Sequence, residues 1–238
     1  MFLDRLLYLF MCVYIILLPL LGSNKVAVMR IHITPSDCIL ALIIFMYIVK
    51  FIAFKKCRER FFSGIKDFFT NYLTIFMSIL VLIMVISVGY AGEKTIALSE
   101  SFRFISYIIL FFIIKYEYNK KQFLNGILGC YIATSAVLCF YGIYQYFTGF
   151  GLSQKFENYE YTKFKIAATM DNPNNLAAFL ILAIFPMAML SIYEKEKIKK
   201  SIYILLTILM LFNVAFTGSR NAIVGIVVGM GILIILYS

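Results

Sequence analysis

Runs of about twenty apolar residues, each bounded by charged or polar ones, follow one another along almost the whole chain. A helix of that length crosses the hydrocarbon core of a bilayer, where the backbone must satisfy its own hydrogen bonds. Of the 238 residues, 63% are hydrophobic and 14% are charged, against roughly half and about a quarter in soluble domains. The sequence therefore excludes a soluble globule and predicts an all-α, polytopic transmembrane helical bundle.

About eight spans are expected from these runs. They cover approximately residues 6–22, 36–54, 69–90, 95–114, 123–147, 171–193, 201–216 and 221–237. Pro35 and Pro173 stand where a helix readily begins. No repeat or linker divides the chain, so a single transmembrane domain over residues 1–238 is expected, with a polar loop over 148–170.

The positive charge indicates orientation rather than a partner. A net charge of +10 would suit nucleic-acid binding in a soluble protein, but here lysines and arginines gather in short loops. With the N-terminus in the cytoplasm, fourteen of the 22 lysines and arginines fall on the cytoplasmic side. We therefore predict a cytoplasmic N-terminus, an extracytoplasmic 148–170 loop, membrane lipid as a partner and no nucleic acid.

Metal and thiol chemistry have little support in the residue pattern. The five cysteines are Cys12, Cys38, Cys57, Cys130 and Cys139, and no pair has metal-ligand spacing. They are interpreted as small apolar fillers. The single histidine, His32, lies in the first outer loop. Neither a metal nor a cofactor is expected.

Glu100 and Arg103 lie within the predicted fourth span, three residues apart and so on one helical face. A charged side chain inside a span costs free energy, so its presence suggests a functional role. One interpretation is an internal ion pair near the outer interface. The other is that Arg103 faces an outward cavity and binds an anion.

Two further stretches lie at the starts of apolar spans. In residues 171–177, Asn172 and Pro173 fit simple helix initiation, whereas Asn174 and Asn175 bring amides into a membrane helix, where they need partners. In residues 217–222, a Gly-Ser turn containing Ser219 precedes Arg220, whose guanidinium suits phosphate; snorkelling is the simpler role. In the predicted orientation both stretches and Arg103 are outside, which favours a shared cleft.

These two stretches resemble the O-antigen ligase and O-antigen polymerase superfamily. Residues 171–177 are similar to the family's N-P-N-x-x-A stretch, and residues 217–222 to the S-R-x-A step about two spans later. The arrangement of spans is similar over the whole chain, whereas the matching motifs lie in its last third. The resemblance places the start of the conserved ligase domain at about residues 210–238.

The resemblance implies a GT-C-like, metal-independent, inverting glycosyltransferase at the outer face of the bacterial inner (cytoplasmic) membrane. It would transfer a glycan from undecaprenyl pyrophosphate to a lipid, a glycan or a protein, so that a lipid-linked glycan is a partner. Arg220 matches the arginine of the S-R step, and Arg103 is a plausible second arginine for the pyrophosphate. The family's proposed catalytic histidine would come after Ser238, because His32 is in the wrong loop.

The chain therefore resembles the N-terminal part of such an enzyme, incomplete at the C-terminus and expected to be inactive alone. Two alternatives stay open. A transporter or flippase for lipid-linked saccharides would also use outward arginines and broken helices. A non-catalytic polytopic membrane protein would have no shared cleft. The acceptor stays open because ligases, polymerases and protein glycosyltransferases share the motifs, and no oligomeric state is indicated.

Overall fold

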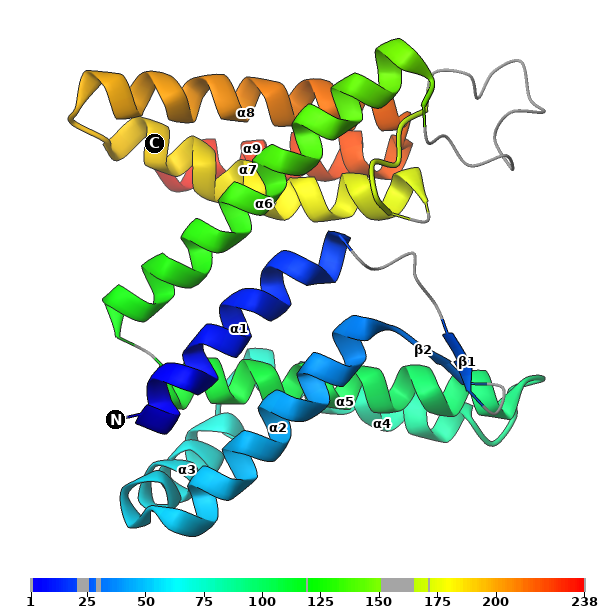
Figure 1. The fold of residues 1–238 in the computed structure, drawn as a ribbon, viewed down its shortest axis with the longest axis vertical. Coiled ribbons are helices and arrows are strands. Elements are labelled where there is room, and N and C mark those ends of the chain that lie inside the picture. The colour runs from blue at the N-terminus through cyan, green and yellow to red at the C-terminus, as the bar shows by residue number, and fades with distance from the viewer. Residues whose placement is uncertain are drawn as a thin grey trace. The chain divides into compact units, whose positions relative to one another are not determined.

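The computed structural model describes residues 2–20, 26–28, 31–118, 120–150, 165–170 and 172–237, and the regular elements in these ranges are helices apart from two short strands (Figure 1). The elements are α1 (Phe2–Leu20), β1 (Val26–Val28), β2 (Ile31–Ile33), α2 (Pro35–Ala53), α3 (Lys55–Phe68), α4 (Tyr72–Ser87), α5 (Lys94–Glu117), α6 (Lys121–Thr148), α7 (Pro173–Tyr193), α8 (Lys197–Thr217) and α9 (Arg220–Tyr237). The strands pair antiparallel, with Val26 opposite Ile33.

The length and hydropathy of the helices confirm a multi-pass, helical membrane protein. Six described helices, α1, α2, α5, α6, α7 and α8, are long and apolar enough to cross a bilayer. Helices α3 and α4 qualify only together, as a seventh span bent by 85°. The apolar part of α9, Arg220–Ile235, is shorter. The structure thus supports six or seven spans within its described residues, and the eighth stays a prediction.

Large apolar side chains cover the outside of the helices, and several polar side chains are buried inside. Phe76 and Ile235 are about three-quarters exposed, whereas Ser135 and Gln145 are completely buried. Lipid solvates apolar side chains as well as a core does, so apolar residues are found on both sides of a membrane helix, whereas polar groups are favoured inside, where they form hydrogen bonds. This distribution agrees with a bilayer as the surrounding solvent.

The basic segment after the second span is a helix, whereas a loop was predicted there. Helix α3 is amphipathic, with Cys57, Gly64 and Phe68 buried on one face and its charges on the other. Phe61 packs edge-on against Phe112 of α5, with ring centroids 5.3 Å apart. The prediction was wrong because it followed the high density of charged residues and not the helical spacing of Cys57, Gly64 and Phe68.

Contacts divide the chain into two compact units. Unit 1 comprises Met1–Leu18 and Asn24–Ile127, and unit 2 comprises Pro19–Ser23 and Leu128–Ser238. In unit 1, α5 packs against α2, α3 and α4. In unit 2, α7 packs against α8 and α9. The prediction of one transmembrane domain over the whole chain stays a prediction.

Each unit has its own core of buried apolar side chains. Unit 1 buries Leu7 and Met11 of α1 together with Ile43 of α2 and Ile113 of α5. Unit 2 buries residues from α6, α7, α8 and α9, which include Leu138, Leu176, Leu180, Met210 and Ala222. Helix α6 begins in unit 1 and continues into unit 2.

Within unit 2, α6 approaches α8 closely at Gly142. A Cβ atom at Gly142 would overlap Asn213 Oδ1 and lie 2.9 Å from Ile166 Cδ1. Gly129, on the same helix, has nothing within 4 Å of its Cβ position. Small residues at such crossings let membrane helices pack closely.

Gly142→Ala is therefore expected to lower the thermal midpoint of the detergent-solubilised protein, by about 1–3 kcal/mol of unfolding free energy, because the added methyl overpacks a buried contact. Gly129→Ala should raise stability by about 0.5–1 kcal/mol through helix propensity alone. Equal responses of the two variants would contradict the close α6–α8 contact.

Candidate functional site

Arg103 lies in unit 1 and is engaged by two carboxylates. Its Nε and Nη2 donate to Asp37 of α2 at 3.1 and 3.2 Å, and its Nη1 donates to Glu100 at 2.6 Å. The expected Glu100–Arg103 ion pair is thus present. The sequence pattern did not indicate Asp37, which is 66 residues away. Anion binding by Arg103 stays a prediction. The two carboxylates disfavour an anion there, because Asp37, Glu100 and Arg103 together carry a net negative charge.

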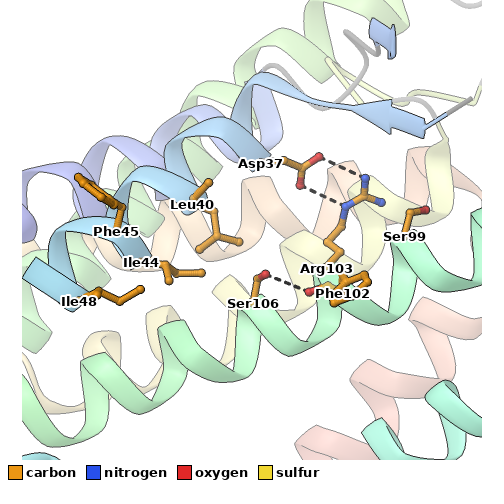
Figure 2. A pocket seen from close by; sticks show the side chains of 10 residues that line it. Asp37, Leu40, Ile44, Phe45, Ile48, Ser99, Phe102, Arg103 and Ser106 are labelled. Carbon is orange, nitrogen blue, oxygen red and sulfur yellow. Dashed lines mark hydrogen bonds and ion pairs between the residues drawn. The ribbon is translucent and has the colours of Figure 1, made fainter. Parts of the chain in front are cut away.

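Asp37 is held in place by the start of α2. Thr34 caps that helix, accepting a hydrogen bond from the Asp37 backbone N–H, while the Asp37 carboxylate accepts from the Thr34 backbone N–H. This reciprocal capping box fixes the carboxylate beside Arg103. A groove of about 470 Å³ extends from this point between α2 and α5 (Figure 2).

The start of α7 has the geometry of an ordinary capped helix. Asn172 Oδ1 accepts from the backbone N–H of Asn174 at 2.8 Å, and the Asn172 carbonyl accepts from that of Asn175 at 3.0 Å. Pro173 has no N–H to offer. The first-turn donors are therefore used within the helix, which confirms helix initiation at Asn172. The side chains of Asn174 and Asn175 are exposed, whereas Asp171 lies outside the described residues.

A tight turn joins α8 to α9 and presents Arg220. Gly218 has φ 64°, a left-handed conformation that glycine adopts without strain. Thr217 Oγ1 accepts from the Ser219 backbone N–H at 3.3 Å. Ser219 is buried, whereas Arg220, the first residue of α9, is exposed.

Helices α7 and α9 run parallel, so both begin at the same end of unit 2. Gly225 faces Ile181 and Gly229 faces Phe185, an identical offset at two successive turns. This register places Arg220 level with Leu176, which lies about one helical turn after the first residue of α7. Two of the predicted stretches, those around Asn172 and Arg220, therefore lie together.

The segment 165–170 brings a second cation to this end. The Gln145 side chain of α6 accepts from the backbone N–H groups of Ala167 and Ala168 at 3.0 and 2.9 Å. Ala168 has φ 51°, a conformation that costs a non-glycine residue free energy. The Ile166 N–H donates to the Phe216 carbonyl at 3.2 Å.

This anchoring lays the Lys165 side chain along the α8–α9 turn. Its Cε lies 3.0 Å from the position of a Cβ on Gly218, two residues before Arg220. We call the end of unit 2 formed by Gln145, Lys165, Asn172, Ser219 and Arg220 the unit 2 site. Sequence reasoning missed Gln145, whose long polar side chain near the end of an apolar run was the available signal.

Several predicted features are not brought together by the described residues. Arg103 belongs to unit 1 and Arg220 to unit 2, so the shared cleft stays a prediction. Most of the 148–170 loop, residues 151–164, lies outside the described residues, and so does the side chain of His32. Over the described part of the chain, no three His, Cys, Asp or Glu side chains gather as metal ligands.

A buried ionic cluster lies elsewhere in unit 1, and the sequence analysis did not predict it. Lys50 Nζ lies 2.7 Å from Asp4 Oδ1 and 2.8 Å from Glu117 Oε2, which also lies 3.0 Å from Arg60 Nη1. The Lys50 and Glu117 side chains are buried. The Lys50 ammonium is thus paired with two carboxylates inside the unit.

Tyr118 supports the cluster by donating its hydroxyl to the Asp4 carbonyl at 2.9 Å. Burial raises the pKa of the Tyr118 phenol. The cluster joins α1, α2, α3 and α5, which indicates a structural role at one end of unit 1.

Comparison of the chain with known protein families, curated proteins and solved structures finds no match.

Proposed function

We propose that the unit 2 site binds the pyrophosphate of a lipid-linked glycan and that the chain acts in a membrane glycosyltransferase of the O-antigen ligase and polymerase type. The donor would be a glycan on undecaprenyl pyrophosphate, and the reaction would take place at the outer face of a bacterial cytoplasmic membrane. The observation that carries the proposal is the pair of cations, Lys165 and Arg220, at the α8–α9 turn.

The chemistry of the two cations suits a pyrophosphate. A guanidinium binds two phosphate oxygens at once, while an ammonium adds a point charge. Arg220 stands at the first position of α9, where the helix dipole also favours an anion. Neutralising pyrophosphate makes it a better leaving group, and fixed cations do this without a metal.

The surrounding contacts favour a preorganised site over a flexible basic loop. Lys165 is held by the backbone contacts of the next three residues, and Arg220 follows a turn that the Gly218 conformation and Thr217 define. Asn174 and Asn175 add exposed amides at the same end of unit 2, suited to phosphate or sugar oxygens. An isoprenoid tail would remain in the surrounding bilayer, against the apolar outer faces of the helices.

Arg220→Lys tests this function directly. The charge remains, but the two-point contact with phosphate is lost, so affinity for farnesyl pyrophosphate should fall about tenfold, equivalent to about 1.4 kcal/mol. The measurement is equilibrium binding of radiolabelled farnesyl pyrophosphate to the chain in lipid nanodiscs. Farnesol, which has no phosphate, should not compete.

Arg5→Lys is the matched control, because Arg5 is an exposed arginine of α1 in unit 1. It should leave the affinity unchanged. Unchanged binding in Arg220→Lys, or equal competition by farnesol, would contradict a pyrophosphate site at Arg220.

A further inference from the structure

We propose that the groove between α2 and α5 in unit 1 binds one acyl chain of a phospholipid whose headgroup carries an ammonium, such as phosphatidylethanolamine. This site differs in place and ligand from the unit 2 site and does not depend on the proposed glycosyl transfer. The groove encloses about 470 Å³, within the range of about 300–1,000 Å³ typical of ligand pockets.

The groove changes from polar to apolar along its length. Asp37, Arg103 and Ser99 line one end, and Leu40, Ile44 and Ile48 of α2 continue from it (Figure 2). From Asp37 to Ile48 the helix rises about 16 Å. A phospholipid has the same sequence of a charged head and an apolar chain.

In a bilayer, the polar end of the groove lies at the depth of the lipid headgroups and the apolar end at the depth of the acyl chains. Asp37 lies in the first turn of α2, a helix that qualifies as a span, so the polar end lies near the interface. Leu40, Ile44 and Ile48 follow at four-residue intervals, deeper along the same helix face. The apolar end therefore opens at the depth of lipid tails, and Phe45, which is 61% exposed, forms part of its wall.

The charge at the polar end selects the headgroup. Two carboxylates, Asp37 and Glu100, share the single guanidinium of Arg103, so the group carries a net negative charge. The Glu100 side chain is 54% exposed and contacts Arg103, which lines the polar end of the groove. An ammonium donates hydrogen bonds to carboxylates, a choline does not, and an anionic glycerol headgroup is repelled.

The experiment uses the whole chain in nanodiscs containing phosphatidylethanolamine with a photoactivatable group in one acyl chain. Peptide mapping after illumination should place the label on α2 between Leu40 and Ile48 and on α5 between Ser99 and Ser106. Ala41 lines the groove, so Ala41→Phe should remove most of the label. Ala53→Phe, at an exposed position of the same helix outside the groove, should keep it.

Headgroup selection is measured by competition with unlabelled lipid. Phosphatidylethanolamine should displace the label better than phosphatidylcholine and much better than phosphatidylglycerol. Glu100→Gln should reduce that preference two- to fivefold, or about 0.4–1 kcal/mol for a partly exposed ion pair. Equal displacement by phosphatidylglycerol, or label unaffected by Ala41→Phe, would overturn the proposal. An unlabelled groove in wild type would overturn it too.

Discussion

Lys50→Met is expected to destabilise unit 1 by about 3–5 kcal/mol, because it leaves the carboxylate of Glu117 buried with one cation fewer. The Lys50 ammonium contacts Asp4 and Glu117, and the Glu117 side chain is 1% exposed. Arg60 also contacts Glu117 but is half exposed, so it compensates only in part. The loss should loosen the contacts among α1, α2 and α5.

Cys57 offers a direct measurement of this loss. It is completely buried in unit 1, so its reaction with a thiol reagent reports opening of that unit, in a background where the other four cysteines are alanine. In the Lys50→Met variant, Cys57 should react with the reagent at a lower temperature than it does in the parent. Lys55→Met should change the labelling temperature little, because Lys55 is exposed and such ion pairs contribute about 0–1 kcal/mol.

The double variant Lys50→Met/Glu117→Leu separates ion pairing from packing. Removing both buried charges leaves Asp4 and Arg60, which have side chains 42% and 48% exposed and are hydrated. The double variant should therefore be more stable than Lys50→Met alone. A double variant less stable than either single variant would contradict a buried charge as the cause.

Gln145→Leu is the second change with a large expected effect. The Gln145 side-chain oxygen accepts from Ala167 and Ala168, and an unpaired buried N–H costs about 1–3 kcal/mol. The variant should lose about 2–5 kcal/mol of stability in unit 2. The same oxygen holds Ala168 in its left-handed conformation, so the segment 165–170 should also relax.

Two readouts distinguish this effect from a general loss of packing. Cys139, completely buried in unit 2, should become reactive at a lower temperature when it is the single cysteine. Farnesyl pyrophosphate binding should weaken at temperatures where Cys139 is still protected, because Lys165 no longer lies over Gly218. Gln122→Leu, at an exposed position of α6, should change neither quantity. Unaltered binding in Gln145→Leu would show that Lys165 is not positioned by this contact.

Local features of the sequence predicted most helices. Apolar length set the spans, and the helix starts at Pro35 and Pro173 follow from proline and its preceding cap residue. The Glu100–Arg103 pair followed from a separation of three residues on a helix. These predictions succeeded because each depends on residues less than about one helical span apart.

The tertiary structure alone decided which helices meet. Asp37 reaches Arg103 across 66 residues, Lys50 reaches Glu117 across 67, and Gln145 reaches Ala168 across 23. In a soluble protein an apolar stripe would indicate the inner face of each helix. In a membrane both the lipid-facing and the inward faces are apolar, so hydropathy gives the span but not its rotation. The partners of Lys50, Arg103 and Gln145 therefore depend on packing between helices, which apolar length does not encode.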